Sequence, residues 1–139
     1  MRDVVDLDAN KAVVRRILED FWGNGDLTAA ELYHPAMVDH SPLPGQLPGR
    51  QGMIDQCRLF HDAFAITLTI EALFAEDDLV CDRWTAVLTH IGPFLGVEPT
   101  GRSATVHAID VMRVREGLIV EAWHQEDMHV ALSALGVLP

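Results

Sequence analysis

The sequence predicts an α+β fold in which a strongly curved antiparallel sheet wraps around N-terminal helices. Three observations support this. Apolar residues recur at helical spacing before residue 65, the chain alternates in the manner of strands after it, and residues 104–129 read as one long hairpin. Helices followed by consecutive strands are typical of the α+β class. At 139 residues, the chain corresponds to a single domain over residues 1–139.

The N-terminal part is predicted to contain three helices and one short strand. The first helix follows Asp8 or Asn10 as its N-cap, and the glycines of GNGD at residues 23–26 end it. The expected elements after it are a short helix at residues 27–32 closed by Pro35, a strand at 37–40, a proline-rich loop at 41–49 and an amphipathic helix at 50–64.

Four consecutive strands are predicted for the rest of the chain. Two of them, at residues 67–75 and 79–91, flank an acidic turn, and a loop with three glycines follows at 92–101. The long hairpin turns at Arg115-Glu116-Gly117, where glycine supplies a positive φ. A last helix is expected at residues 128–135, before Gly136.

The hairpin is where we expect the functional site. On the first strand, alternation places His107, Ile109 and Val111 on one face and Val106, Ala108 and Asp110 on the other. On the return strand, Trp123, Gln125 and Asp127 share one face, and His124 and Glu126 share the other. With His107 and Asp127 facing inward, the hairpin brings an imidazole and a carboxylate into one apolar hollow. Asp110 lies off that face, and we interpret it as structural.

Composition and charge exclude several classes of partner. A formal net charge of −11 does not suit nucleic acid or an anionic membrane surface. No run approaches the ~20 apolar residues of a membrane span. The N-terminal MRDVVDLDANK lacks the apolar core of a signal peptide, so we expect a cytoplasmic protein. A hydrophobic content of 49% fits a well-cored domain.

Short motifs in order along the chain resemble the SnoaL-like polyketide cyclases, also called ester cyclases. They are VDHSP at residues 38–42, PGRQG at 48–52, DRWT at 82–85, GVEPTGR at 96–102, IDVMRV at 109–114 and GLIVEAW at 117–123. The match runs from about Lys11 to Gly136. This group belongs to the cone-shaped α+β superfamily, with a cystatin-like fold, that includes ketosteroid isomerase, scytalone dehydratase and limonene epoxide hydrolase.

The resemblance implies cofactor-independent, intramolecular aldol ring closure of a small apolar or aromatic carbonyl compound. It implies an Asp near the end of the last strand as general acid/base, which we match to Asp127, and a polar residue of the pocket, which we match to His107. Burial would raise the pKa of such an Asp from ~3.9 toward a useful range. The alternative for Asp127 is the N-cap of the last helix, and for His107 a satisfied core histidine.

Further residues are expected to bind the substrate or form the walls of the pocket. They are His40, Trp22, Tyr33, Phe60, Phe64, Trp84, Trp123 and Gln125. Thr85 and Gln125 stand where the epoxide hydrolases carry the carboxylates bridged by an Arg, so the water-activating triad is broken. No histidine pair has metal-ligand spacing on a helix, so we expect no metal site.

Two alternatives to a cyclase remain open. One is an isomerase, dehydratase or hydrolase of the same superfamily, and the other is a non-catalytic module for ligand binding or dimerisation. An enclosed cavity that both Asp127 and His107 line would favour an enzyme. The superfamily is often dimeric through the outer sheet face, and we expect a homodimer that uses Val106, Ala108, Met112 and Ala122.

Overall fold

A five-stranded sheet forms the frame of the computed structural model, which describes residues 5–139. The strands are β1 (Tyr33–Asp39), β2 (Phe64–Glu76), β3 (Leu79–His90), β4 (Ser103–Arg115) and β5 (Leu118–Glu126), in the spatial order β1-β5-β4-β3-β2. The four long strands pair antiparallel in chain order, as predicted. The α+β fold class is therefore confirmed.

β1 makes the sheet mixed, because it pairs in parallel with the last strand, β5. It is longer than the predicted strand at residues 37–40 and contains Pro35, which was expected to close the preceding helix. A proline lacks the N–H that a central strand needs, but an edge strand tolerates it. The edge position of β1 therefore explains how the strand accommodates Pro35, and the pairing with β5 explains its length.

The helices are α1 (Leu7–Arg16), η1 (Ile17–Gly23, π-helical), η2 (Leu27–Leu32, 3-10), α2 (Gly49–Ala63) and α3 (Met128–Ala134). The N-cap of α1 is Asp6, whose carboxylate accepts a hydrogen bond from the Ala9 N–H at 3.0 Å, and not Asp8 or Asn10. No helix within residues 5–139 combines the length and the apolar character needed to cross a bilayer.

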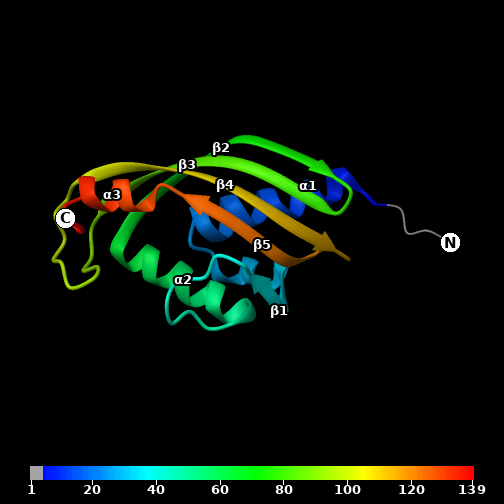
Figure 1. Ribbon diagram of the computed structural model, residues 1–139, viewed down its shortest axis with the longest axis horizontal. Coiled ribbons are helices and arrows are strands. Elements are labelled where there is room, and N and C mark those ends of the chain that lie inside the picture. The colour runs from blue at the N-terminus through cyan, green and yellow to red at the C-terminus, as the bar shows by residue number, and fades with distance from the viewer. Residues whose placement is uncertain (1–4) are drawn as a thin grey trace.

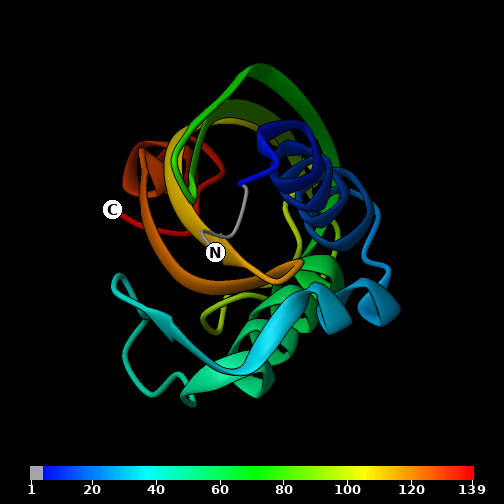
Figure 2. The ribbon, with the colours of Figure 1, turned by 90° about the vertical axis from the view of Figure 1, so that its right-hand side faces the viewer.

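The sheet curls around the helical layer, as the end-on view in Figure 2 shows. Figure 1 shows α1 beneath the long strands, with α2 and β1 further below and α3 at the opposite end from the N-terminus. Irregular pairing between Ile70 and Ala72 of β2 interrupts the ladder, and such bulges bend a strand. The main core joins Val14, Ile17 and Phe21 of the N-terminal helices to the concave side of the sheet.

The hairpin formed by β4 and β5 turns at Glu116 and Gly117, with φ values of 51° and 76°, so the glycine acts as predicted. The alternation of side chains is confirmed along β4, whereas a register shift interrupts it in β5 between Ile119 and Glu121. The choice of the inner face is wrong, however, because Val106, Ala108 and Asp110 are buried while His107 is exposed. The chain buries the face with the larger share of apolar residues.

The residues expected to form a dimer interface lie on this same concave face. Val106, Ala108, Met112 and Ala122 are all 4% exposed or less. Val106, Met112 and Ala122 also belong to the core clusters and line the cavity. They cannot reach a second subunit. An interface on the outer side of the sheet would instead use residues of opposite parity, such as Ile109.

Candidate active site

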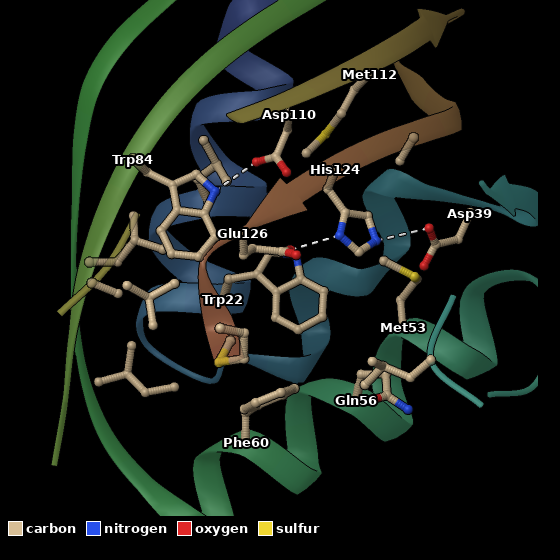
Figure 3. A pocket seen from close by; sticks show the side chains of 18 of the residues that line it. Trp22, Asp39, Met53, Gln56, Phe60, Trp84, Asp110, Met112, His124 and Glu126 are labelled. Atoms are coloured by element: carbon tan, nitrogen blue, oxygen red, sulfur yellow. Dashed lines mark hydrogen bonds and ion pairs between the residues drawn. The ribbon is translucent and has the colours of Figure 1, made fainter. Parts of the chain in front are cut away.

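A cavity of about 170 Å³ lies between the concave face of the sheet and the helices. Figure 3 shows it with indole rings on one side and a group of polar side chains from β1, β4 and β5 on the other. Its apolar walls come from η1, α2 and the long strands, and they include Leu18, Phe60, Leu68, Ala86, Leu88 and Val106. Pockets for small ligands commonly combine such walls with a few convergent polar groups.

Asp39, His124 and Glu126 form a hydrogen-bonded chain at the polar side of the cavity (Figure 3). The Nε2 atom of His124 lies 2.9 Å from Oδ1 of Asp39, and its Nδ1 atom lies 2.7 Å from Oε1 of Glu126. Gln46, from the proline-rich loop, donates to Oδ2 of Asp39 at 2.9 Å. Both ring nitrogens of His124 therefore face carboxylates.

These carboxylates keep His124 protonated at neutral pH. Burial alone would lower the pKa of His124, but the hydrogen bonds to Asp39 and Glu126 outweigh it and raise the pKa to about 10. Burial likewise opposes ionisation of Asp39, yet hydrogen bonds from His124 and Gln46 lower its pKa. The cavity thus contains an imidazolium, and none of its described lining residues is a lysine or arginine.

Asp110 of β4 also lines the cavity and is 5% exposed. The indole Nε1–H of Trp84 donates to its Oδ2 at 2.7 Å (Figure 3). Burial raises the pKa of Asp110 above its usual value, which makes this carboxylate a stronger base than one in water. The sequence-based view of Asp110 as only structural placed it on the outer face and is wrong in that respect.

Asp110, His124 and Glu126 hold donor atoms that all lie within 4.8 Å of one another, a spacing that a metal ion could bridge. Both ring nitrogens of His124 are already engaged by carboxylates. A metal ion would have to replace one of these hydrogen bonds to bind His124. A buried carboxylate such as that of Asp110 can remove a proton from an activated carbon.

Four predicted wall residues line the cavity, and four predicted substrate-binding residues do not. Trp22, Tyr33, Phe60 and Trp84 are in its lining, where the Trp22 Nε1–H donates to the Tyr33 hydroxyl at 2.9 Å. The residues that lie elsewhere are His40, Phe64, Trp123 and Gln125. His40 and Trp123 stack on each other at 4.7 Å, and Phe64 is buried in the second core cluster.

His107 and Asp127 meet as predicted, but on the outside of the sheet. Nδ1 of His107 lies 2.8 Å from Oδ2 of Asp127, and the two side chains are 61% and 38% exposed. The hydrogen bond from the backbone N–H of His107 is the main cause that lowers the pKa of Asp127, and the bond from the His107 ring adds to it. The expectation that the pair lies within an apolar hollow is wrong.

Asp127 does occupy the N-cap position of α3, but its side chain caps no N–H of that helix. Its carboxylate instead accepts hydrogen bonds from the backbone and ring of His107, and its own N–H donates to the His107 carbonyl. The pair therefore fastens the start of α3 to β4.

The sequence-based site does not include the polar residues that line the cavity, although the sequence contains a signal for some of them. Val106, Ala108, Met112 and Val114 make the even-numbered face of β4 the more apolar, and Asp110 lies on it. By the pairing with β4, His124 and Glu126 share that face. Asp39 carries no comparable signal, because the parallel pairing of β1 with β5 is not evident from the sequence.

Comparison with known proteins identifies a protein family and several solved structures that are similar to this chain. A family model described as SnoaL-like polyketide cyclase matches residues 12–135. TsrD from Streptomyces laurentii is 26% identical over 97% of this chain and 100% of its own, with a TM-score of 0.84. AclR from Streptomyces galilaeus, a proposed hydroxylase, is 28% identical over 96% and 100%, with a TM-score of 0.82.

IdmH from Streptomyces antibioticus, a proposed polyketide cyclase, is 30% identical to this chain, with a TM-score of 0.79. The match covers 92% of this chain and 99% of IdmH. A comparison with curated proteins finds no match. Because the family model spans nearly the whole described domain, the chain belongs to the SnoaL-like polyketide cyclase family.

Proposed function

We propose that this protein is a cyclase that closes a ring by intramolecular aldol addition in a small, largely apolar carbonyl compound, without a cofactor. Family membership supports a cyclase or a related enzyme. The observation that carries the proposal is the presence of Asp110 and the His124 imidazolium in the lining of one apolar cavity. The exposed His107–Asp127 pair is not part of it.

Asp110 would act as the general acid/base. Its carboxylate takes a proton from the activated carbon, the resulting enolate carbon attacks the second carbonyl, and a C–C bond forms as that oxygen becomes an alkoxide. Asp110 then returns the proton to the alkoxide, so the enzyme is regenerated and no co-reactant is consumed. Burial of Asp110 favours the proton-bound form that this cycle requires.

His124 would join Asp39 to Glu126 at the polar side of the cavity. Its imidazolium lies next to Asp110, and its positive charge offsets the charges of the two carboxylates that it contacts. Asp39 and Glu126 hold the ring from both sides, so its charge and orientation are set before the substrate binds.

The cavity volume bears on the size of the substrate. An apolar cavity of about 150 Å³ binds benzene in another protein, so about 170 Å³ corresponds to one six-membered ring with a small substituent. Trp22, Trp84 and Phe60 offer aromatic faces to such a ring. We therefore propose single-ring aromatic keto esters, which carry the two carbonyl groups that ring closure needs, as the first compounds to test.

The decisive comparison is between Asp110→Asn and Asp127→Asn, assayed for ring closure in the presence of a chelator. We expect Asp110→Asn to lose about 10²- to 10⁴-fold in kcat, since it cannot accept a proton, while Asp127→Asn stays within a few-fold of wild type. Thermal melting verifies that both variants fold. Equal turnover by wild type and Asp110→Asn, or ligand binding without any turnover, would contradict the proposal.

A further inference from the structure

A second aspartate lies directly across the sheet from Asp110. Asp82 of β3 is the register partner of Asp110 on β4, and both side chains face the concave side. Asp82 is 0% exposed and Asp110 is 5% exposed. Directly opposed residues on one sheet face have Cβ atoms about 5 Å apart, so the two carboxyl groups are neighbours.

Asp82 has no counter-charge among the described residues. Apart from Asp110, neither of its carboxyl oxygens has a hydrogen-bond partner among the described residues. Its register partner on β2 is Leu73, and its neighbours on the same face of β3 are Val80 and Trp84. The charge of Asp110 acts on the pKa of Asp82. The charges of His124 and Glu126 act in turn on the pKa of Asp110.

Two carboxylates in this position would both be charged in a nearly dry environment, an arrangement that costs several kcal/mol per unpaired ion. A single proton removes the conflict, because one carboxyl then donates a hydrogen bond to the other. Asp82 is the better holder of that proton. Burial first, and then the charge of Asp110, raise the pKa of Asp82, whereas Asp110 already accepts from the Trp84 indole.

We propose that Asp82 is a protonated positioning residue, which donates a hydrogen bond to the Asp110 carboxylate and orients it toward the cavity. Asp110 then has two fixed donors, the Asp82 hydroxyl and the Trp84 indole. Both favour its ionised form and offset part of the effect of burial. This inference rests on the proposed function for its catalytic consequence, but the location of the proton can be tested without any substrate.

Infrared spectroscopy at pH 7 is the first test, because a protonated carboxyl group has a C=O stretch that a carboxylate lacks. We expect the band of a buried protonated carboxyl in wild type, its loss in Asp82→Asn, and its retention in Asp110→Asn and in the exposed control Asp127→Asn. Loss of the band in Asp110→Asn with retention in Asp82→Asn would place the proton on Asp110 and overturn the proposal.

The second test is the pH profile of kcat/KM for two substitutions of Asp82. Asn keeps a neutral hydrogen-bond donor, so Asp82→Asn should stay within a few-fold of wild type. Leu removes the donor, so Asp82→Leu should shift the acidic limb upward by about one pH unit, the equivalent of 1.36 kcal/mol. Unshifted profiles in both variants would contradict a positioning role.

The two tests separate this inference from the proposed function. If the wild-type protein shows no ring closure but the infrared band follows Asp82, the cyclase proposal fails and the shared proton stands. If ring closure depends on Asp110 but the infrared band persists in Asp82→Asn, the cyclase proposal stands and the proposed proton on Asp82 fails. Should Asp82→Leu fail to fold, Asp82→Asn and the infrared measurement still decide the question.

Discussion

At the scale of single residues, His124 shows how neighbouring charges set a protonation state. The ring is partly buried, which disfavours its charged form, yet it lies 2.9 Å from one carboxylate and 2.7 Å from another. Charge-assisted hydrogen bonds of this kind outweigh the cost of partial burial. The consequence is an imidazolium that persists well above the pH at which a free histidine loses its proton.

The raised pKa of His124 predicts how its contribution to stability changes with pH. Between its unfolded pKa of 6.5 and its folded pKa of about 10, the folded state binds more protons than the unfolded state. The contribution is therefore complete below pH 6.5 and is lost as the pH rises through 10. We expect the difference in Tm between wild type and His124→Gln to narrow from pH 6 to pH 10, as measured by thermal melting.

His129→Gln is the matched control for this experiment, because His129 is exposed and follows Asp127 by only two positions. The difference in Tm between His129→Gln and wild type should stay small and constant from pH 6 to pH 10. A difference for His124→Gln that widens with pH would show that His124 is neutral in the folded protein.

The sequence predicts which residues of the hairpin share a face, because alternation depends only on backbone geometry. It is less informative about which face turns inward. The acid/base pair of His107 and Asp127 suggests one face, whereas the burial of Val106 and Ala108 decides for the other. Apolar area is a stronger determinant of strand orientation than the position of an attractive polar pair.

At the scale of elements, the prediction of secondary structure succeeds where the local sequence pattern determines the structure. It fails where pairing with a segment far away in the sequence determines it. The β2–β5 meander and α2 follow from alternation, helical spacing and turn residues. β1 exists as a strand because β5 supplies hydrogen bonds from more than 80 positions away, as in the bond from the His40 N–H to the Ala122 carbonyl. No local signal encodes that pairing.

The contact between α2 and the preceding loop predicts an unusual effect for a helical glycine. Ala normally stabilises an exposed helix by about 1 kcal/mol relative to Gly. At Gly52, however, an added Cβ would lie 1.9 Å from the backbone oxygen of Leu47. We therefore expect Gly52→Ala to destabilise the protein by roughly 1–3 kcal/mol in chemical denaturation, because backbone must move.

The loop displaced by Gly52→Ala carries Leu43 and Gln46, which line the cavity, so ligand binding should weaken as well. Arg58→Ala, an exposed change on the same helix, serves as the control and should alter stability by less than about 0.5 kcal/mol. A Gly52→Ala variant that is as stable as wild type would mean that the loop can move away without cost.

At the scale of the whole molecule, charge predicts which form of a ligand is accepted. The chain carries a formal net charge of −11, and the carboxylates of Asp39 and Glu126 already engage the His124 imidazolium in the cavity. An anionic ligand would enter without a free counter-ion. We expect the methyl ester of a single-ring aromatic keto acid to bind at least about tenfold more tightly than the free acid, a difference of ~1.4 kcal/mol.

Quenching of the Trp22 and Trp84 indoles, which lie in the cavity lining, provides a binding signal for both ligands. Higher salt should reduce the difference in affinity between the ester and the acid, since ions screen the repulsion between the acid and the surface charges. Equal or tighter binding of the acid would show that a cation in the cavity is free to receive it.

The outer face of the sheet leads to a prediction about assembly. Val87 of β3 and Ile109 of β4 are 44% and 54% exposed there, on the side away from the cavity. An antiparallel sheet with one solvated face usually carries polar residues on it, so these apolar side chains suit contact with a second copy. We expect a homodimer through this face and not through the buried residues of the concave face.

Ile109→Lys should convert the dimer to a monomer, because each subunit would then bury an unpaired charge at the centre of the contact. Leu59→Lys places the same change on an exposed position of α2, which is 43% exposed, and should leave the dimer intact. Size-exclusion chromatography with light scattering distinguishes the two states. If the wild-type protein is monomeric at micromolar concentration, or if both variants remain dimeric, the outer sheet face is not the interface.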